Sequence, residues 1–166
     1  MVDSGRKVIL GVDPGLNTTG YGIIEKSPES APVLVEAGTI RSNAKLPLSD
    51  RLGELYDGIT EVLDSAVPDL MGLEEIYAHY RHPATAIVMA HARGVLLLAA
   101  QQKGVKVRSL PATRIKKIVT GNGRASKEQV NGMVRHLLAI QDEVKPLDVS
   151  DALAAAIAAL EMERHD

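Results

Sequence analysis

Four acidic residues lie at places along this chain where a fold could gather them into one site. Asp13 ends an apolar run and is followed at once by Pro-Gly, and Glu74 lies inside a second apolar run. Asp148 and Asp151 are three residues apart at the start of a segment rich in Ala and Leu. A carboxylate in an apolar segment is costly to bury unless it is paired, hydrogen-bonded or bound to a metal. Oxygen ligands of this kind suit Mg²⁺ or Mn²⁺, so the set predicts a two-metal site that acts on phosphate esters.

Each acid also has an explanation without chemistry. Asp13 could organise the turn that follows it, and Asp148 and Asp151 suit a helix start because they face the positive end of the helix dipole. Glu74 is followed by Glu75, whose side chain points to the opposite face of a strand. The pattern alone does not say which of these two neighbours enters a site.

The basic residues are concentrated in one segment. The chain has a formal net charge of -2, yet no Asp or Glu occurs between Ile76 and Lys127. A segment of one sign attracts a polyanion such as nucleic acid. The alternative is an ordinary solvated surface that acids from elsewhere in the fold balance.

Candidate nucleic-acid contacts occur within and beside this segment. A glycine-containing loop precedes the helix start at Lys127, where backbone N–H groups can bind a phosphate. Tyrosines beside an arginine could stack on exposed bases, although simple solvation or core packing is the alternative for each residue. The candidates are Lys116, Lys117, Arg124, Lys127, Tyr77, Tyr80 and Arg81.

The bulk composition fits one ordinary globular domain. The chain has 166 residues, 45% hydrophobic and 24% charged, so one domain over 1–166 is expected. The absence of cysteine excludes thiolate metal sites and fits a cytoplasmic setting. No signal-peptide form begins the chain. His91 and Arg93 interrupt the longest apolar stretch, 84–100, which favours a buried or interface helix over a membrane span.

The elements that must position these residues mix both types of secondary structure. Strands are expected at 7–13, 20–25, 33–41, 70–77 and 105–110, and helices at 49–66, 83–102, 111–119, 127–139 and from 148. Ser49 is the expected N-cap of the first helix, and Ser126 and Gln129 form a capping box. Short connections make the first three strands antiparallel, and the later two should pair parallel. This order predicts an α/β fold with a five-stranded mixed sheet flanked by helices.

Five segments together resemble the bacterial Holliday junction resolvases of the RuvC family, the crossover junction endodeoxyribonucleases. They include both acidic strands, the centre of the long apolar helix, the glycine loop with its basic helix start, and the last helix. The segments are 9–22, 73–77, 92–94, 121–130 and 148–154. The resemblance runs from about residue 7 to 160 in one register, which makes it specific.

The resemblance implies an RNase H-like, structure-selective endonuclease that resolves four-way DNA junctions in recombination and repair. It implies metal-dependent phosphodiester hydrolysis that leaves 5′-phosphate and 3′-hydroxyl ends. It further implies that Asp13, Glu74, Asp148 and Asp151 bind two Mg²⁺ ions per subunit, with Mn²⁺ able to substitute. This choice favours Glu74 over its neighbour. A homodimer and branch-migration motor partners are also implied, and the apolar helix is the expected dimer contact because its all-round apolarity needs a second cover.

The resemblance also ranks the expected DNA contacts. Lys116 and Lys127 become the basic residues nearest the scissile backbone. Tyr77 stands where the family usually has a Phe that wedges against junction bases, so this chain keeps the stacking face but adds a hydroxyl. Glu75 stands where a Gln is common in relatives, which leaves an extra negative charge near the site.

Two other functions are compatible with the same residues. The acids alone permit another RNase H-like nuclease, one that cuts RNA–DNA hybrids or flaps. The basic segment alone permits a junction-binding module without turnover. A sugar-kinase or actin-type fold shares the strand with Asp and Gly but needs two such domains, which 166 residues do not supply.

Overall fold

The elements follow the predicted order in a computed structural model, which describes residues 5–76 and 82–165. The strands are β1 (Lys7–Asp13), β2 (Thr18–Lys26), β3 (Val33–Arg41), β4 (Leu70–Glu74) and β5 (Lys106–Leu110). The helices are α1 (Leu48–Ala66), α2 (Pro83–Gln102), α3 (Ala112–Thr120), α4 (Lys127–Leu137) and α5 (Leu147–Glu163).

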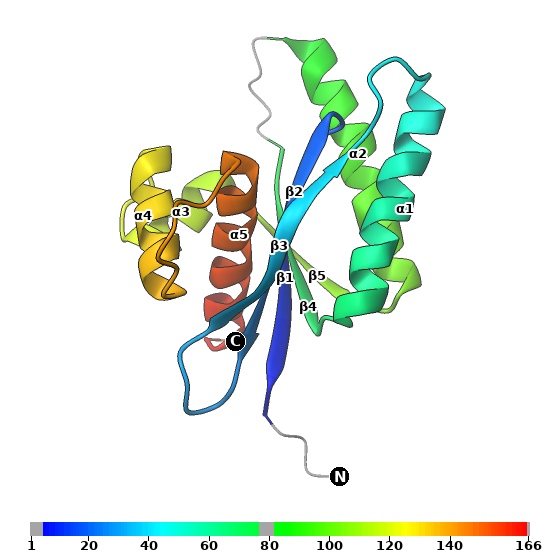
Figure 1. Cartoon of the computed structure of the whole chain (residues 1–166). Helices are drawn as coiled ribbons and strands as arrows, with labels where there is room; N and C mark the ends of the chain where they lie inside the picture. The colour runs from blue at the N-terminus through cyan, green and yellow to red at the C-terminus, as the bar shows by residue number, and fades with distance from the viewer. Residues whose placement is uncertain (1–4, 77–81, 166) are drawn as a thin grey trace.

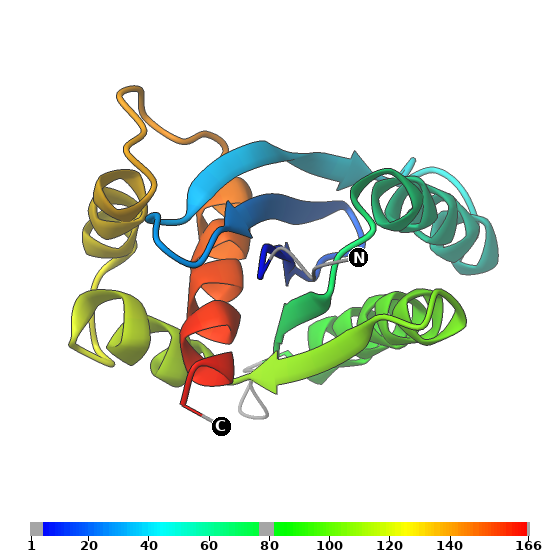
Figure 2. The same cartoon turned by 90° about the horizontal axis from the view of Figure 1, so that it is seen from below.

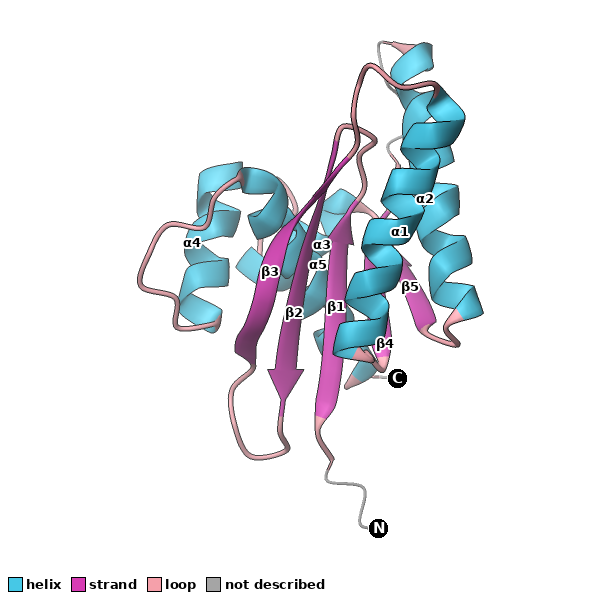
Figure 3. Cartoon of the chain, turned by 45° about the vertical axis from the view of Figure 1, so that its right-hand side comes forward, coloured by secondary structure: helices cyan, strands magenta, loops and turns pink. Residues whose placement is uncertain are grey.

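The five strands form one mixed sheet in the order β3-β2-β1-β4-β5, as Figure 3 shows. β1 pairs antiparallel with β2, and β2 with β3, whereas β4 pairs parallel with both β1 and β5. The predicted α/β fold, with three antiparallel strands followed by two parallel ones, is confirmed.

Helices cover both faces of this sheet. α1 and α2 lie on one face and α3, α4 and α5 on the other (Figures 1 and 2). Alternation along the strands divides the core accordingly, because successive side chains point to opposite faces. Leu10 and Leu73 pack in the cluster under α1 and α2, whereas Ile9 and Leu70 pack in the cluster under α5. The two faces of β1 and β4 are therefore assigned without ambiguity.

A row of glycines lets α5 lie directly on the sheet. Gly11 pairs with Gly22 on one side and with Gly72 on the other, so the three residues cross β2, β1 and β4 in one line. A Cβ at Gly11 would lie 1.9 Å from the carbonyl oxygen of Ala152. One at Gly72 would lie 2.6 Å from the carbonyl oxygen of Ala155. Only glycine permits this approach, because a Cβ so close to helix backbone would force the helix away.

Several element boundaries differ from the predictions by one to three residues, and two of these differences, at the end of β4 and the start of α1, concern predicted features. β4 ends at Glu74, and the two described residues after it are not strand, whereas the strand was expected to reach residue 77, which lies outside the described residues. The prediction of Ser49 as the N-cap of α1 is wrong, because the helix begins at Leu48. Its first turn closes where the Arg51 N–H donates to the Pro47 carbonyl at 3.1 Å.

The predicted capping box at the start of α4 is confirmed. The Gln129 N–H donates to Ser126 Oγ at 3.1 Å, and the Ser126 N–H donates to Gln129 Oε1 at 2.8 Å. These two bonds satisfy backbone donors that a helix start leaves free. They fix the first turn of α4, and with it the position of Lys127.

α2 keeps part of its apolar surface uncovered. Ala92 and Leu96 on its inner side are fully buried, whereas Ile87 is 60% exposed and Leu98 51% exposed. In the described parts of the chain, α2 is the one helix whose length and apolar composition would allow a membrane crossing, which by itself is weak evidence. Partial burial against α1 and the sheet agrees with the predicted buried or interface helix.

Candidate active site

Asp13 and Glu74 point to the same face of the sheet, at the ends of two neighbouring parallel strands. Asp13 lies two residues after Gly11, and Glu74 lies two residues after Gly72. Each acid is therefore the next residue on the same face of its strand beyond the glycine row. Both side chains therefore face α5, because residues two apart on a strand share a face. Glu75 lies just past the end of β4 and is exposed, whereas Glu74 lines a cleft at the ends of these strands, so Glu74 is the one of the two that enters it.

A buried hydroxyl braces the turn that follows Asp13. Thr19 Oγ1 donates to the Gly15 carbonyl at 2.5 Å and accepts from the Gly15 N–H at 3.2 Å. The Thr19 side chain is fully buried. This pair of bonds locks the chain directly after the strand and so limits the movement of the Asp13 backbone.

The first two turns of α5 carry Asp148 and Asp151 close to the ends of these strands. A Cβ at Gly20, the residue that pairs with Asp13, would lie 2.1 Å from the Asp148 carbonyl oxygen. A side chain there would push the start of α5 away from β2. Asp151 then follows one turn later and reaches the same cleft as Asp13 and Glu74.

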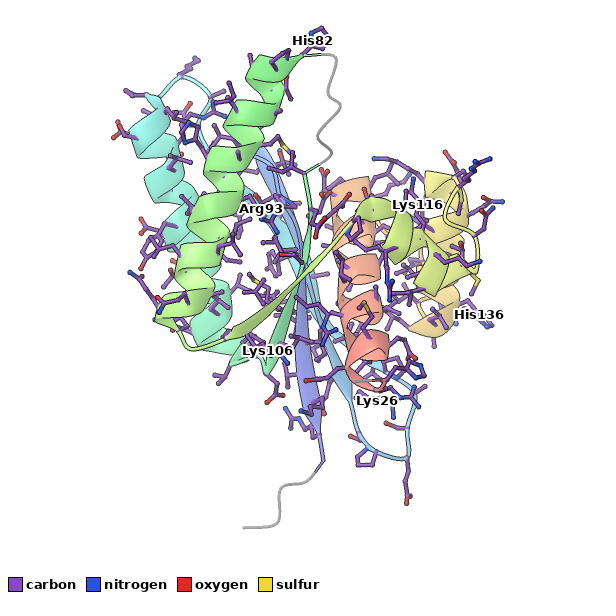
Figure 4. The ribbon with its side chains drawn as sticks, turned by 180° about the vertical axis from the view of Figure 1, so that it is seen from behind. Lys26, His82, Arg93, Lys106, Lys116 and His136 are labelled. Atoms are coloured by element: carbon purple, nitrogen blue, oxygen red, sulfur yellow. The ribbon has the colours of Figure 1, made fainter. Side chains whose placement is uncertain are left out.

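The acids and two lysines line one cleft of about 180 Å³. It lies at the junction of the sheet edge with α3, α4 and α5. Its lining residues are Asp13, Glu74, Ala112, Ile115, Lys116, Lys127, Val130, Asp151 and Ala154. Figure 4 shows Lys116 on α3, beside the first turns of α5. Three carboxylates and two ammonium groups thus share a small space with apolar walls.

The surroundings of the cleft favour the protonated form of Asp13. Burial, together with the negative charges of Glu74, Asp151 and Asp148, raises the pKa of Asp13 to about 8, although the charge of Lys127 opposes this rise. A carboxyl group with this pKa is largely protonated at neutral pH. Asp148 does not line the cleft, but its influence on the Asp13 pKa places its charge within electrostatic range.

The pKa values of the other two cleft acids, Glu74 and Asp151, are also raised. Burial raises the pKa of Glu74, and Asp151 adds to the rise, whereas a hydrogen bond with Asp13 and the charges of Lys127 and Lys116 lower it. Burial also raises the pKa of Asp151, although Lys127 opposes this rise. Neighbouring carboxylates that cannot all ionise cheaply mark a place where additional positive charge would be stabilising.

Lys127 supplies part of that charge from the start of α4. Its Nζ lies 3.4 Å from Asp151 Oδ2, and this pairing raises the pKa of Lys127. The lysine side chain remains 61% exposed, whereas that of Asp151 is 22% exposed. The cation therefore stands at the mouth of the cleft, in contact with both the acids and solvent.

The donor chemistry of the cleft fits hard divalent cations. Its acidic groups offer carboxylate oxygens only, the ligands that Mg²⁺ prefers, and ionisation of such groups is favoured when a cation binds. Within residues 5–76 and 82–165, no three acidic or histidine side chains are drawn together tightly enough to hold an ion as they stand. The ammonium group of Lys127, beside Asp151, supplies positive charge that partly balances the cleft acids.

Two other predicted DNA contacts, Lys117 and Arg124, do not line this cleft. Lys117 is exposed on α3, and its Nζ donates to the Gly121 carbonyl at 2.9 Å. Arg124 is exposed in the loop before α4, where its N–H donates to Asn122 Oδ1 at 2.9 Å. Tyr77, Tyr80 and Arg81 lie outside the described residues.

Two features of the site were not predicted from the sequence. One is the glycine row of Gly11, Gly22 and Gly72, whose members lie 11 and 50 residues apart in the sequence and so show no periodic signal. The other is Arg93 on α2, whose Nε donates to the Glu74 carbonyl at 3.3 Å. Arg93 belongs to a segment that resembles the RuvC family, but that resemblance assigned it no role.

The sequence model described as "Crossover junction endodeoxyribonuclease RuvC" matches residues 9–159 of this chain. The chain belongs to the RuvC family. The RuvC of Rhodopirellula baltica is 47% identical over 149 residues, which cover 90% of this chain and 83% of that protein. The RuvC of Desulforamulus reducens is 39% identical over 151 residues, which cover 90% of this chain and 91% of that one.

Solved RuvC structures share the whole architecture. Thermus thermophilus RuvC superposes with a TM-score of 0.86 at 29% identity, covering 95% of this chain and 96% of that one. The same RuvC in complex with a Holliday junction substrate gives a TM-score of 0.90 and covers 96% of each chain. A yeast mitochondrial Holliday junction resolvase, 13% identical with a TM-score of 0.63, shares the fold. The predicted RuvC resemblance and the RNase H-like fold are confirmed.

Proposed function

We propose that this chain resolves four-way DNA junctions by hydrolysing phosphodiesters in paired strands, leaving 5′-phosphate and 3′-hydroxyl ends. One observation carries the proposal. In a chain of the RuvC family, Asp13, Glu74 and Asp151 converge from two strands and a helix on a cleft that also holds Lys116 and Lys127. The acids suit metal ions, and the lysines suit the phosphates that those ions would act on.

Asp13, Glu74, Asp148 and Asp151 would hold two Mg²⁺ ions per subunit, or Mn²⁺ in their place. When bound, such ions activate a water and stabilise the leaving oxygen of an in-line displacement. The raised pKa values of Asp13, Glu74 and Asp151 support this role, because a divalent charge would favour ionisation of all three. Burial of the acids against α5 keeps their orientation fixed before substrate arrives.

Lys116 and Lys127 would bind the phosphate backbone at the mouth of the cleft. Lys127 is suited to this role because it is already at Asp151 and still largely exposed. Arg124 and Lys117 would extend the contact along the DNA backbone from α3 and the following loop. Tyr77, Tyr80 and Arg81 stay predictions as base-stacking and backbone contacts.

The working unit would be one nuclease domain per chain, paired in a homodimer. The uncovered apolar side of α2 supports a contact between copies, since Ile87 and Leu98 are both more than half exposed. A two-fold dimer presents two sites to two opposed strands of a junction. Branch-migration motor partners and a cytoplasmic location complete the proposal.

A cleavage assay on synthetic DNA tests this function. The chain should nick four-way junctions at paired positions with Mg²⁺ or Mn²⁺, leave linear duplex intact, and do nothing in EDTA. Asp13→Asn should bind the junction but fail to nick it. Faster cutting of an RNA–DNA hybrid would favour the other RNase H-like nuclease, and junction binding without metal-dependent nicking would favour a binding module.

A further inference from the structure

Arg93 joins α2 to the ends of the neighbouring parallel strands β4 and β5. Its Nε donates to the Glu74 carbonyl on β4 at 3.3 Å, and its Nη2 donates to Ser109 Oγ on β5 at 2.5 Å. The side chain is partly buried, and Figure 4 labels it on the side of α2 that faces the sheet. One planar guanidinium thus holds two neighbouring strands at the edge where the cleft begins.

Arg93 reaches the sheet from the face opposite the Glu74 carboxylate. Ser109 pairs with Leu73, whose side chain packs in the core under α1 and α2. The Glu74 carboxylate lies on the α5 face, in the cleft. Arg93 therefore acts on the backbone of Glu74 and does not contact the side chain that would carry the chemistry.

This backbone position matters because regular pairing stops there. β4 ends at Glu74. The described chain continues for two more residues, with the Glu75 N–H donating to the Leu110 carbonyl at 2.8 Å. Rotation of the last peptide of a strand would swing the side chain attached to it. The Arg93 contact limits that rotation, in the way that outer contacts orient metal ligands elsewhere.

We infer that Arg93 is a positioning residue, which ties the orientation of Glu74 to the seating of α2. The inference rests on the proposed nuclease function, since it concerns the same cleft. α2 also bears the uncovered apolar surface that is proposed to contact a second copy of the chain. The same helix therefore carries both this surface and the arginine that holds the backbone of Glu74.

Single-turnover cleavage of a four-way junction tests this role. Arg93→Ala should slow cleavage about 10- to 100-fold and raise the Mg²⁺ concentration needed for half the maximal rate. Junction affinity in EDTA should stay within about twofold of wild type, because the brace lies away from the DNA-facing lysines. Arg93→Lys should recover only part of the rate, since one ammonium does not reproduce the two-pronged contact. Millimolar guanidinium should partly restore Arg93→Ala.

Ser109→Ala provides a milder version that keeps the arginine. It removes one of the two contacts, so the cleavage rate should fall by less than in Arg93→Ala. The double variant should cleave only slightly more slowly than Arg93→Ala alone. Lys103→Ala is the matched control, because it removes a cation at the end of the same helix whose partner is Asp64 at 2.6 Å. This control should cleave like wild type.

Three results would overturn the inference. The first is wild-type cleavage and Mg²⁺ dependence in both Arg93→Ala and Ser109→Ala. The second is a large loss of junction affinity in EDTA for Arg93→Ala, which would make Arg93 a DNA contact. The third is a change of oligomeric state in that variant by sedimentation. Failure of the proposed function looks different, because then wild type would not nick junctions or Asp13→Asn would still nick them.

Discussion

Lys127 Nζ lies 3.4 Å from Asp151 Oδ2, which places the first residue of one helix against the first turns of another across the mouth of the cleft. The contact neutralises one of several crowded carboxylates. It also leaves the ammonium in reach of solvent, so that the same group can meet an incoming phosphate. Its removal should therefore affect both the DNA affinity and the acids.

Lys127→Ala should weaken junction binding and lower the dependence of affinity on salt. Each phosphate contact releases about one counterion, so the slope of log affinity against log salt should fall by about 0.9. Fluorescence anisotropy of a labelled junction in EDTA, from low to moderate salt, measures this. Lys145→Ala is a suitable control, since Lys145 is exposed and pairs with Glu143 at 3.0 Å. An unchanged slope in Lys127→Ala would remove this lysine from the phosphate-binding set.

The metal-free protein should lose stability as the pH rises from about 4 to about 8. The pKa of Asp13 is raised to about 8 in the folded chain, whereas an unfolded Asp titrates near pH 4. The folded state therefore holds this proton more tightly, so the stabilisation is present at low pH and is lost as the pH rises through about 8. Glu74 and Asp151, whose pKa values are also raised, act in the same sense.

Asp13→Asn should reduce the pH dependence of stability, because the amide side chain does not titrate in this pH range. In EDTA at pH 8 the variant should melt above wild type, by about 2–4 °C for each kcal/mol of relieved repulsion. Thermal unfolding at several pH values measures the difference. Parallel stability curves for the two proteins would show that Asp13 titrates normally.

Mg²⁺ should stabilise the wild-type chain and release protons on binding. The raised pKa values mean that the cleft acids hold protons that a cation must displace. The melting temperature should rise with Mg²⁺ concentration, and calorimetry in buffers of different ionisation enthalpy should reveal proton release near neutral pH. Asp13→Asn should show less of both effects. Equal proton release in the variant would place the titrating group elsewhere.

Gly72→Ala should damage both stability and cleavage. Its Cβ would lie 2.6 Å from the Ala155 carbonyl oxygen and 2.8 Å from the Ala159 Cβ, so α5 would have to move. Overpacking of this kind costs about 1–3 kcal/mol of unfolding free energy, and movement of α5 would carry Asp151 with it. Chemical denaturation and junction cleavage measure the two consequences.

Gly53→Ala is the matched control for that substitution. Gly53 lies in α1, and a Cβ there meets nothing within 4 Å. Because alanine favours helix, the change should stabilise the protein by about 0.5–1 kcal/mol and leave cleavage unaltered. A stable, active Gly72→Ala protein would mean that α5 does not depend on the glycine row.

The local pattern of residues determined much of the fold and most of the cleft. The apolar runs in 7–13 and 70–77 predicted strands, with Asp13 at the end of the first and Glu74 inside the second. Ser126 with Gln129 predicted the start of α4. These signals are readable because they depend on neighbours within a few residues. The boundary at Ser49 was wrong because a backbone carbonyl, that of Pro47, closes the first turn instead of a side chain.

Only the tertiary structure decided which residues meet. The end of β4 separated Glu74, which lines the cleft, from the exposed Glu75. Periodicity had left this choice open, and the family resemblance had favoured Glu74. Close packing of α5 on Gly11, Gly20 and Gly72 set how near Asp148 and Asp151 come to the strands. The contact of Arg93 with the Glu74 carbonyl joins residues 19 apart through a main-chain atom. A backbone carbonyl leaves no mark in the residue types, so such contacts exist only once helix and sheet are packed.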